Sequence, residues 1–221
     1  MIKALVFDAY GTLFDVHSVG KECNEVFPNK GDAISQSWRK KQLEYFFLRQ
    51  LMQRYKPFDE ITKDALNYAC KENGAELSKE NEKRLMDAYL KLDLFEEVET
   101  VLQQLSQKKL VVFSNGSKNM IDPLVEQSNI RSSIDLVISA DEIKQYKPTP
   151  AAYNHALEQL EMKREEILFM SSNPWDITGA KSFGFHTAWI NRKDLVYEEL
   201  DIQPDTVYSD LSGIMEWIEK T

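Results

Sequence analysis

Short apolar segments that alternate with helical segments are the feature that most constrains the fold of this chain. The first, residues 2–7, is a nearly continuous apolar run that stops at Asp8. A run of this kind is typical of a strand that is buried on both faces of a parallel sheet. Comparable segments recur in the second half of the chain, at residues 110–113, 134–138, 167–170, 186–190 and near Val207. The alternation predicts an α/β fold whose core is a Rossmann-like parallel sheet.

The long segment between the first two predicted strands has helical periodicity instead. Between Trp38 and Tyr55, bulky apolar side chains recur at steps of three, four and five residues, as they do on the buried face of a helix. Pro57 interrupts this pattern. Further helices are predicted over residues 62–73, 78–92, 151–160, a segment that ends at Phe183, and 211–219.

The two patterns predict two domains. A core domain of residues 1–15 and 94–221 would contain the sheet, and a helical cap domain of residues 16–93 would be inserted after the first strand. Because the insertion follows a loop at the carboxyl edge of the sheet, the cap would cover that edge as a lid and exclude water from it. A site is therefore expected between the lid and the sheet edge.

The charge and the apolar content disfavour several kinds of partner. The chain has 27 basic and 36 acidic side chains and a formal charge of −9, so that we expect no binding to nucleic acid. No apolar stretch approaches the roughly 18 residues of a membrane span, and the first apolar run is too short for a secretion signal. We expect a cytoplasmic protein without membrane contact, in which Cys23 and Cys70 are reduced, partly buried thiols.

Polar side chains gather in four loops that follow predicted strands. These loops contain Asp8, Ser114, Lys147 and the segment from Asn173 to Asp176. In an open parallel sheet, the carboxyl ends of the strands meet at one edge, where ligands bind. We expect the four loops to form one site there.

Asp8 is the candidate nucleophile of this site. The sequence contains neither a Ser-His-Asp nor a Cys-His signature, and His17, His155 and His186 lie in unrelated sequence contexts. An aspartate at the end of an apolar strand is an unusual structural choice, unless it caps a turn or a helix. A carboxylate nucleophile can form an ester or an acyl phosphate, and on these residues alone both reactions stay open.

Four motifs resemble those of the haloacid dehalogenase superfamily and follow each other in the same order. They are Phe-Asp-Ala-Tyr-Gly-Thr-Leu-Phe-Asp at residues 7–15, Val-Phe-Ser-Asn-Gly at 112–116, Lys-Pro at 147–148 and Ser-Ser-Asn-Pro-Trp-Asp at 171–176. Within the superfamily, the chain most resembles the L-2-haloacid dehalogenases, through residues 14–19, residues 38–45 and the Ser-Ser-Asn-x-Trp-Asp run. The resemblance covers nearly the whole chain and implies an enzyme that hydrolyses a carbon–halogen bond.

Two positions depart from the magnesium phosphatases that make up most of this superfamily. Those enzymes carry a second aspartate two residues after the nucleophile to protonate the leaving alkoxide, but this chain has Tyr10 there. A phenol of reference pKa near 10 cannot replace a carboxylic acid as acid and then base near neutrality. Phosphatases also commonly carry an acid about four residues before Asp176, where this chain has Ser172, and Mg²⁺ requires several carboxylate oxygens. We therefore expect neither a metal ion nor an organic cofactor.

A halide leaving group fits these departures, because a halide leaves as a stable anion and needs no proton. The resemblance implies that Asp8 attacks C2 of an L-2-haloalkanoic acid from the face opposite the halogen and forms an ester with inverted configuration. Water would then attack the carboxyl carbon of Asp8 and release the D-2-hydroxy acid.

The resemblance also implies roles for polar residues of the core loops. Lys147 would pair with Asp8 and keep it ionised, and Thr12 would hydrogen-bond the Asp8 region. Ser114 and Asn115 would bind the substrate carboxylate through hydroxyl, amide and loop N–H donors. The same two residues can also form an ordinary turn or helix cap.

The fourth loop would serve the second step of the reaction. Asn173 and Asp176 would orient the hydrolytic water, with Asp176 as the base or its support through Lys147. An acid at the start of a predicted helix is stabilising by itself, which is the alternative explanation for Asp176. Ser171 would lie near the nucleophile and Tyr153 near Lys147.

A second group of residues would bind the halogen and the alkyl group of the substrate. Arg39, in the predicted cap, resembles the arginine of the family that receives the departing halide and helps to hold the substrate. A guanidinium is weakly hydrated and tolerates burial beside aromatic rings, although a solvated helix arginine is the simpler alternative. Tyr10, Leu43, Phe58 and Trp175 would form the apolar wall, although each, and Phe58 above all, can instead be a core residue.

Other functions remain open on the sequence. The same site fits a hydrolase of fluoroacetate or of a strained-ring amino acid, whereas Tyr10 and Ser172 disfavour a phosphatase. A non-catalytic binding protein would have no reason to keep Asp8, Arg39 and Lys147 together with Asp176. The resemblance further suggests a homodimer formed through the helical block, whose aromatic residues Tyr45, Phe46 and Phe47 can instead fill the core of the cap.

Overall fold

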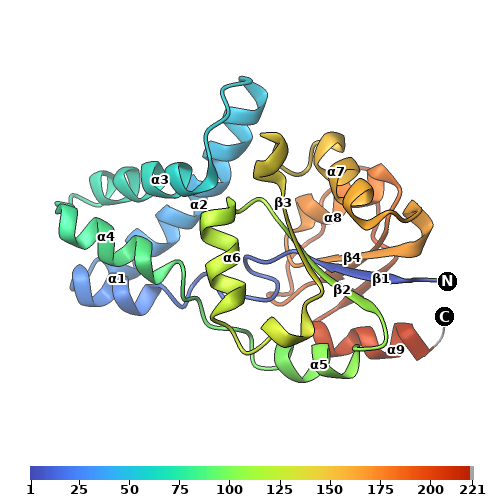
Figure 1. Ribbon diagram of the computed structural model, residues 1–221. Coiled ribbons are helices and arrows are strands. Elements are labelled where there is room, and N and C mark those ends of the chain that lie inside the picture. Colours follow the sequence, from blue (N-terminus) through green and yellow to red (C-terminus); the bar gives the residue numbers. More distant parts are fainter. Residues whose placement is uncertain (220–221) are drawn as a thin grey trace.

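The computed structural model describes residues 1–219 and has a six-stranded parallel sheet at its centre (Figure 1). The strands are β1 (Ala4–Phe7), β2 (Lys109–Ser114), β3 (Leu136–Ser139), β4 (Ile167–Ser171), β5 (His186–Ile190) and β6 (Thr206–Tyr208). Their order across the sheet is β3-β2-β1-β4-β5-β6, and every neighbouring pair is parallel. The predicted α/β fold is confirmed, and β1 lies inside the sheet between β2 and β4.

Helices cover both faces of the sheet, which explains why β1 in its interior is apolar throughout. In β1, Ala4 and Val6 point to one face while Leu5 and Phe7 point to the other, and all four are fully buried. The covering helices are α7 (Pro150–Leu160) and α8 (Pro174–Phe183) on the Ala4 side, and α5 (Val98–Gln104), α6 (Lys118–Glu126) and α9 (Ile214–Glu219) on the Leu5 side.

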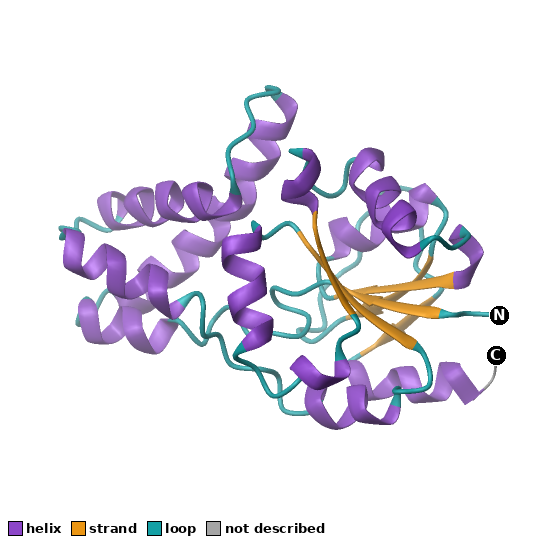
Figure 2. Ribbon diagram, viewed as in Figure 1, coloured by secondary structure: helices purple, strands orange, loops and turns teal. Residues whose placement is uncertain are grey.

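Four other helices lie together beyond the end of the sheet toward which β1 points, on the left in Figure 1. They are α1 (Gly20–Val26), α2 (Gly31–Leu51), α3 (Phe58–Glu72) and α4 (Lys79–Ala88). In Figure 2 this part consists of helices and loops, and the sheet lies in the other part. Trp38 of α2 is buried here and donates from Nε1 to the main-chain oxygen of Thr62 at 2.7 Å. The helical insertion thus has the predicted location, and its treatment as a separate cap domain of residues 16–93 stays a prediction.

Two features of the helical part differ from the prediction. The periodicity extended to Tyr55, but α2 ends at Leu51, and the ring of Tyr55 stacks instead on Tyr146 of the core with centroids 5.1 Å apart. Helix α1 was not predicted, because Cys23 is its only buried residue and a single buried position leaves no periodic apolar face. Tertiary contacts decide both segments, since the apolar pattern of α2 continues past the end of the helix and α1 has no such pattern.

Two further predictions concern the state of the cysteines and contact with a membrane. Cys23 and Cys70 are free thiols, as expected, but both are fully buried rather than partly buried. Among residues 1–219, no helix is both long enough and apolar enough to cross a membrane. The cytoplasmic location stays a prediction.

The loop after β1 turns sharply at the carboxyl edge of the sheet. Gly11 has a φ angle of +88°, which residues with a side chain rarely adopt, and its N–H donates to the main-chain oxygen of Phe14 at 2.7 Å. The N–H of Leu13 donates to the main-chain oxygen of Ala9 at 3.0 Å. This tight turn returns the chain toward the end of β1 before it enters the helical part.

Candidate active site

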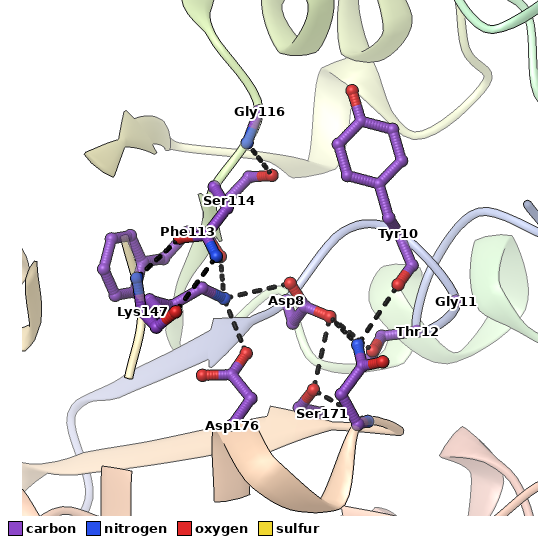
Figure 3. A network of polar contacts seen from close by, with 12 residues as sticks. Asp8, Tyr10, Gly11, Thr12, Phe113, Ser114, Gly116, Lys147, Ser171 and Asp176 are labelled. Carbon is purple, nitrogen blue, oxygen red and sulfur yellow. Dashed lines mark hydrogen bonds and ion pairs between the residues drawn. The ribbon is translucent and has the colours of Figure 1, made fainter. Parts of the chain in front are cut away.

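The predicted loops meet at one edge of the sheet, with Asp8 at their centre (Figure 3). Asp8 follows β1 directly and is 4% exposed. One carboxylate oxygen, Oδ1, accepts a hydrogen bond from Lys147 Nζ at 2.9 Å. The other, Oδ2, accepts from three neutral donors: Asn173 Nδ2 at 2.8 Å, Thr12 Oγ1 at 3.1 Å and Ser171 Oγ at 3.2 Å. The structure therefore brings four predicted site residues into direct contact with Asp8.

Lys147 is fully buried and joins two carboxylates. Its Nζ lies 2.9 Å from Asp8 Oδ1, 2.6 Å from Asp176 Oδ2 and 3.0 Å from the main-chain oxygen of Phe113, which uses all three of its N–H groups. Burial alone lowers the pKa of Lys147, but the charges of Asp176 and Asp8 outweigh burial, and the pKa is raised above its ordinary value. Lys147 is thus a fixed positive charge between the two acids.

Asp176 lies in the first turn of α8 and is fully buried. Its Oδ1 and its main-chain oxygen accept hydrogen bonds from the hydroxyl of Tyr153 at 2.7 and 3.0 Å. Burial raises the pKa of Asp176 to about 6, although the charge of Lys147 acts in the opposite direction. Burial also raises the pKa of Tyr153 well above its ordinary value, so that the phenol stays a hydrogen-bond donor. A carboxyl group that titrates near pH 6 is suited to accept a proton near neutrality.

Ser114 and Asn115 use their side chains within the loops themselves. Ser114 Oγ accepts a hydrogen bond from the N–H of Gly116 at 2.9 Å. Asn115 Oδ1 accepts from the N–H of Lys147 at 2.8 Å, and Asn115 Nδ2 donates to the main-chain oxygen of Lys147 at 3.3 Å. The contact between Asn115 and the Lys147 loop was not predicted, and binding of the substrate carboxylate by Ser114 and Asn115 through hydroxyl, amide and loop N–H donors stays a prediction.

Tyr10 and Ser172 occupy the two positions at which phosphatases of the superfamily carry acids. Tyr10 is 4% exposed, burial raises the pKa of its phenol far above the ordinary value, and its hydroxyl has no hydrogen-bond partner within residues 1–219. Ser172 donates from Oγ to the main-chain oxygen of Gly11, and its N–H donates to Thr12 Oγ1 at 2.9 Å. In the described part of the chain, no three His, Cys, Asp or Glu side chains are grouped as a metal site.

A cavity of about 480 Å³ lies between the helical part and the fourth loop. Arg39 and Leu43 of α2 line it from one side, and Asn173 and Trp175 from the other. The half-buried Arg39 donates from one terminal nitrogen to Gln42 Oε1 at 2.7 Å. The indole N–H of Trp175 is buried and has no hydrogen-bond partner among the described residues. Three of the residues that were predicted to bind substrate thus share one cavity.

Phe58 is a packing residue at the start of α3. It is 2% exposed, and its ring stacks on Tyr10 with centroids 5.6 Å apart and lies 6.2 Å from the ring of Phe46. This agrees with the core role that the sequence left open for it. Its contact with the alkyl group of a substrate stays a prediction.

Gln42 is a site residue that sequence reasoning missed. It is fully buried, and its Oε1 accepts hydrogen bonds from Arg39 at 2.7 Å and from the hydroxyl of Tyr89 at 3.1 Å. Its Nε2 donates to Thr62 Oγ1 at 2.7 Å. A glutamine three residues after a candidate arginine lies on the same side of a helix, and this spacing is the signal that would have found it.

A comparison with known protein families agrees with the motifs of the four loops. The family model for haloacid dehalogenase-like hydrolases matches residues 2–184 of this chain. The chain belongs to this family. The match extends from β1 to the end of α8. It includes every site residue that was predicted from the sequence, from Asp8 to Asp176. The predicted family is thereby confirmed.

Individual members of the family resemble the chain over nearly its whole length. The (S)-2-haloacid dehalogenase of Pseudomonas sp. (strain YL) is 46% identical over 220 residues, which cover 99% of this chain and 95% of the relative. Haloacetate dehalogenase H-2 of Moraxella sp. (strain B) is 42% identical over 219 residues and 98% of both chains. The structure of an L-2-haloacid dehalogenase from Xanthobacter autotrophicus with covalently bound chloropropionic acid is 34% identical, with a TM-score of 0.92 and 99% of each chain covered.

Proposed function

We propose that this protein is an (S)-2-haloacid dehalogenase, which converts L-2-haloalkanoic acids into D-2-hydroxy acids through an ester on Asp8. The observation that carries the proposal is the environment of Asp8, a buried carboxylate held by Lys147 and neutral donors beside the phenol of Tyr10. The relatives that are (S)-2-haloacid dehalogenases support the reaction. The related structure with covalently bound chloropropionic acid supports a covalent intermediate.

In the first step, a carboxylate oxygen of Asp8 displaces the halide. Oδ1 carries one hydrogen bond and Oδ2 carries three, so that Oδ1 has the more available lone pairs. It attacks C2 from the face opposite the halogen; the C–O bond forms while the carbon–halogen bond breaks, and the halide leaves with the electron pair. The fixed contacts of the carboxylate reduce the entropy that must be lost to align it. The leaving halide needs no proton, which agrees with a neutral, buried Tyr10.

In the second step, water attacks the carboxyl carbon of Asp8 and splits the ester. Asp176, whose pKa is about 6, is ionised at neutral pH and accepts the proton of the water, directly or through Lys147. That proton then passes to the departing 2-hydroxyl oxygen as the C–O bond of the ester breaks, and the second proton of the water leaves the Asp8 carboxyl group for solvent, which restores the carboxylate. Asn173 and Thr12, which donate to Oδ2, stabilise the negative charge that develops on the attacked carboxyl group.

The halide leaves toward the donors on the cavity side. Arg39 donates to Gln42 and interacts with the hydroxyl of Tyr89, and the indole N–H of Trp175 has no partner in the described structure. Both residues line the same cavity, so that together they offer a positive charge and a free N–H to the anion. Leu43 supplies part of the apolar wall. A guanidinium suits a soft anion because it is weakly hydrated.

The substrate carboxylate binds at the loop that follows β2. The N–H of Gly116 already donates to Ser114 Oγ, so that the hydroxyl hydrogen of Ser114 and the other main-chain N–H groups of the loop, that of Asn115 among them, are the donors for the anion. The neutral side chains at Tyr10 and Ser172 leave few oxygen ligands of the kind that Mg²⁺ requires, which supports a reaction without metal or organic cofactor.

Hydrolysis of haloacetates is the second candidate function. The Moraxella relative, which is 42% identical over 219 residues, is a haloacetate dehalogenase. The same nucleophile would attack the methylene carbon of a haloacetate, fluoroacetate included, by the same two steps. Turnover of both substrate types is compatible with one cavity.

Halide release tests the proposed function. The protein is incubated separately with L- and D-2-chloropropanoate in the presence of EDTA, and Asp8→Asn serves as the matched variant. We expect chloride from the L form alone, with retained activity in EDTA and loss of activity in the variant. Turnover by Asp8→Asn would contradict the nucleophile, and cleavage of a phosphate ester that requires Mg²⁺ would contradict the interpretation of Tyr10.

We also propose that the protein is a cytoplasmic homodimer with its interface on α2. Phe46 is 1% exposed, and Phe47 packs edge-on against Trp175 with centroids 5.2 Å apart, so that both rings fill the molecule's own core. Leu48 and Leu51 remain exposed at the end of the same helix, at 43% and 80%. These two side chains support an interface there. A single species near 25.7 kDa in gel filtration would contradict the dimer.

A further inference from the structure

The cavity beside Arg39 has a rim that the proposed reaction does not use. We call His17, Asn191, Arg192 and Lys193 the rim; His17 lies after the loop of β1, and the other three follow β5. His17 and Lys193 are exposed to solvent while they also line the cavity. A ligand that enters the cavity from solvent on this side passes these residues.

Structural contacts hold Arg192, although its buried Nε has no hydrogen-bond partner among residues 1–219. One terminal nitrogen lies 2.6 Å from Glu97 Oε1 and also donates to the main-chain oxygen of Thr12 at 2.8 Å. The guanidinium carbon lies 3.8 Å from the centroid of the Phe95 ring. The carboxylate of Glu97 balances the charge of Arg192, so that it adds little net attraction for an anion.

Lys193, in contrast, has no carboxylate within 4.0 Å in the part of the chain that the structure describes. Its Nζ lies 3.0 Å from His17 Nε2. Burial, followed by the charge of Lys193, lowers the pKa of His17, so that at neutral pH the imidazole accepts this hydrogen bond. Asp15, the acid in the cavity lining, accepts the main-chain N–H of His17 at 2.9 Å.

The charge of the rest of the molecule makes this lysine significant. The chain has a formal charge of −9 and repels an anion at long range. Other exposed lysines without a carboxylate within 4.0 Å among the described residues, such as Lys40 and Lys91, do not line this cavity, so that its position and not its lack of a partner distinguishes Lys193. Lys193 is an exposed positive charge at the entrance of a cavity whose inner wall carries Arg39. Two cations in sequence along one route lower the barrier that the net charge sets for an entering anion.

We propose that Lys193 recruits the carboxylate of the incoming 2-haloacid at the rim and thereby sets the rate of productive encounter. The inference rests on the proposed function for the identity of the anion, a small monocarboxylate. Lys193 takes no part in bond breaking; it contacts the substrate on entry and releases it to the loop after β2. It therefore affects kcat/KM and leaves kcat unchanged.

Charge variants at the rim test the inference through the salt dependence of halide release. Lys193→Gln should reduce kcat/KM for L-2-chloropropanoate about fivefold at low ionic strength, and Lys193→Glu about 25-fold, with kcat within about twofold. Lys193→Arg keeps the charge and should retain the wild-type value. In sodium sulfate of about 0.5 M ionic strength, these differences should shrink to within about twofold, because the Debye length falls to a few ångströms.

Two control variants separate recruitment from other effects. Lys3→Gln removes the same charge beside the start of β1, at the opposite edge of the sheet, and should leave kcat/KM unchanged. His17→Ala removes the hydrogen-bond partner and keeps the lysine, so that kcat/KM should stay within about twofold of the wild-type value.

The possible outcomes separate this inference from the proposed function. Absence of halide release by the wild-type protein would overturn the proposed function, and with it the identity of the recruited anion. If the wild type is active, equal kcat/KM in Lys193→Gln and wild type would overturn recruitment alone. A loss that persists at high ionic strength, or that His17→Ala reproduces, would assign Lys193 a structural role instead.

Discussion

Two groups of polar side chains in the site are held in different ways: the core side around Asp8 and Lys147, and the cap side, which we define as Arg39 of α2 and Trp175 of α8, whose ring packs against Phe46 and Phe47 of α2. On the core side, Asp8 accepts four side-chain hydrogen bonds, and Lys147 donates all three of its N–H groups to the protein. On the cap side, Arg39 donates to Gln42 and also interacts with the hydroxyl of Tyr89, and the indole N–H of Trp175 has no hydrogen-bond partner among residues 1–219.

This difference separates the group that reacts from the groups that receive a ligand. The nucleophile is oriented by contacts within the protein before substrate arrives, whereas donors on the cap side keep hydrogen-bonding capacity for an anion. A buried donor without a partner costs about 1–3 kcal/mol, which a bound halide would offset. Substitutions on the core side should therefore reduce both stability and activity, and those on the cap side should reduce activity alone.

Substitution of Lys147 by Met should have the largest effect. It leaves the carboxylates of Asp8 and Asp176 buried without a positive partner, and breaking such a buried pair costs about 3–5 kcal/mol of unfolding free energy. Halide release should fall by at least about 10³-fold, because the nucleophile loses its alignment. Urea unfolding and halide assays measure both, with Lys144→Met as the exposed control. Unchanged stability in Lys147→Met would remove the distinction between the two sides.

Substitution of Arg39 by Gln should reduce kcat/KM by about 10²-fold while the unfolding free energy stays within about 1 kcal/mol. The half-buried side chain has the neutral side chains of Gln42 and Tyr89 as its hydrogen-bond partners, so that its removal leaves no buried charge without a partner. Lys40→Gln removes the same charge from an exposed position of α2 and serves as the control. A loss of several kcal/mol in Arg39→Gln would show that the cap side is held as tightly as the core side.

The pH dependence of the second step should report the titration of Asp176. Its pKa is about 6, so that it is ionised above this pH and protonated below it, and a protonated carboxyl group cannot accept a proton from water. Hydrolysis of the ester should therefore slow by about tenfold per pH unit below pH 6. In rapid-quench experiments the ester on Asp8 should accumulate at pH 5 and not at pH 7.5. Equal accumulation at both values would assign the base to another group.

Substitution of Tyr10 by Phe should have the smallest effect. The hydroxyl is buried and has no hydrogen-bond partner within residues 1–219, so that its removal should change the unfolding free energy by about 1 kcal/mol at most, toward higher stability. Halide release should stay within about twofold of the wild-type rate. A large loss of kcat would assign the phenol a contact with substrate and break the division between the two sides.

The core side was predictable from sequence for a physical reason. A strand that is buried on both faces has to be apolar, and polar residues that follow such strands mark the carboxyl edge of the sheet. Asp8, Lys147 and Asp176 were recognised in this way, and the structure brings all three into one hydrogen-bonded group. Their sequence separation did not matter, because the parallel topology alone determines that the loops meet.

The cap side was less predictable because its contacts depend on tertiary packing. Periodicity places Arg39 on a helix but does not show that Gln42 is its partner, nor that Thr62 and Tyr89 hold Gln42 in turn. The predicted extension of this helix to Tyr55 was wrong for the same reason. The ring lies four residues beyond the end of α2 and continues the apolar spacing of the helix, but it packs on the core. Local patterns report burial, whereas the identity of the neighbour comes from the fold.

The most direct test of the ester on Asp8 is a single turnover in H₂¹⁸O with enzyme in excess over L-2-chloropropanoate. The hydroxyl oxygen of the first product should come from Asp8 and carry no label, and mass spectrometry of the peptide that contains Asp8 should show one ¹⁸O gained. Label in the first product and none in the Asp8 peptide would mean that water attacks C2 directly, and Asp8 would then not be the nucleophile.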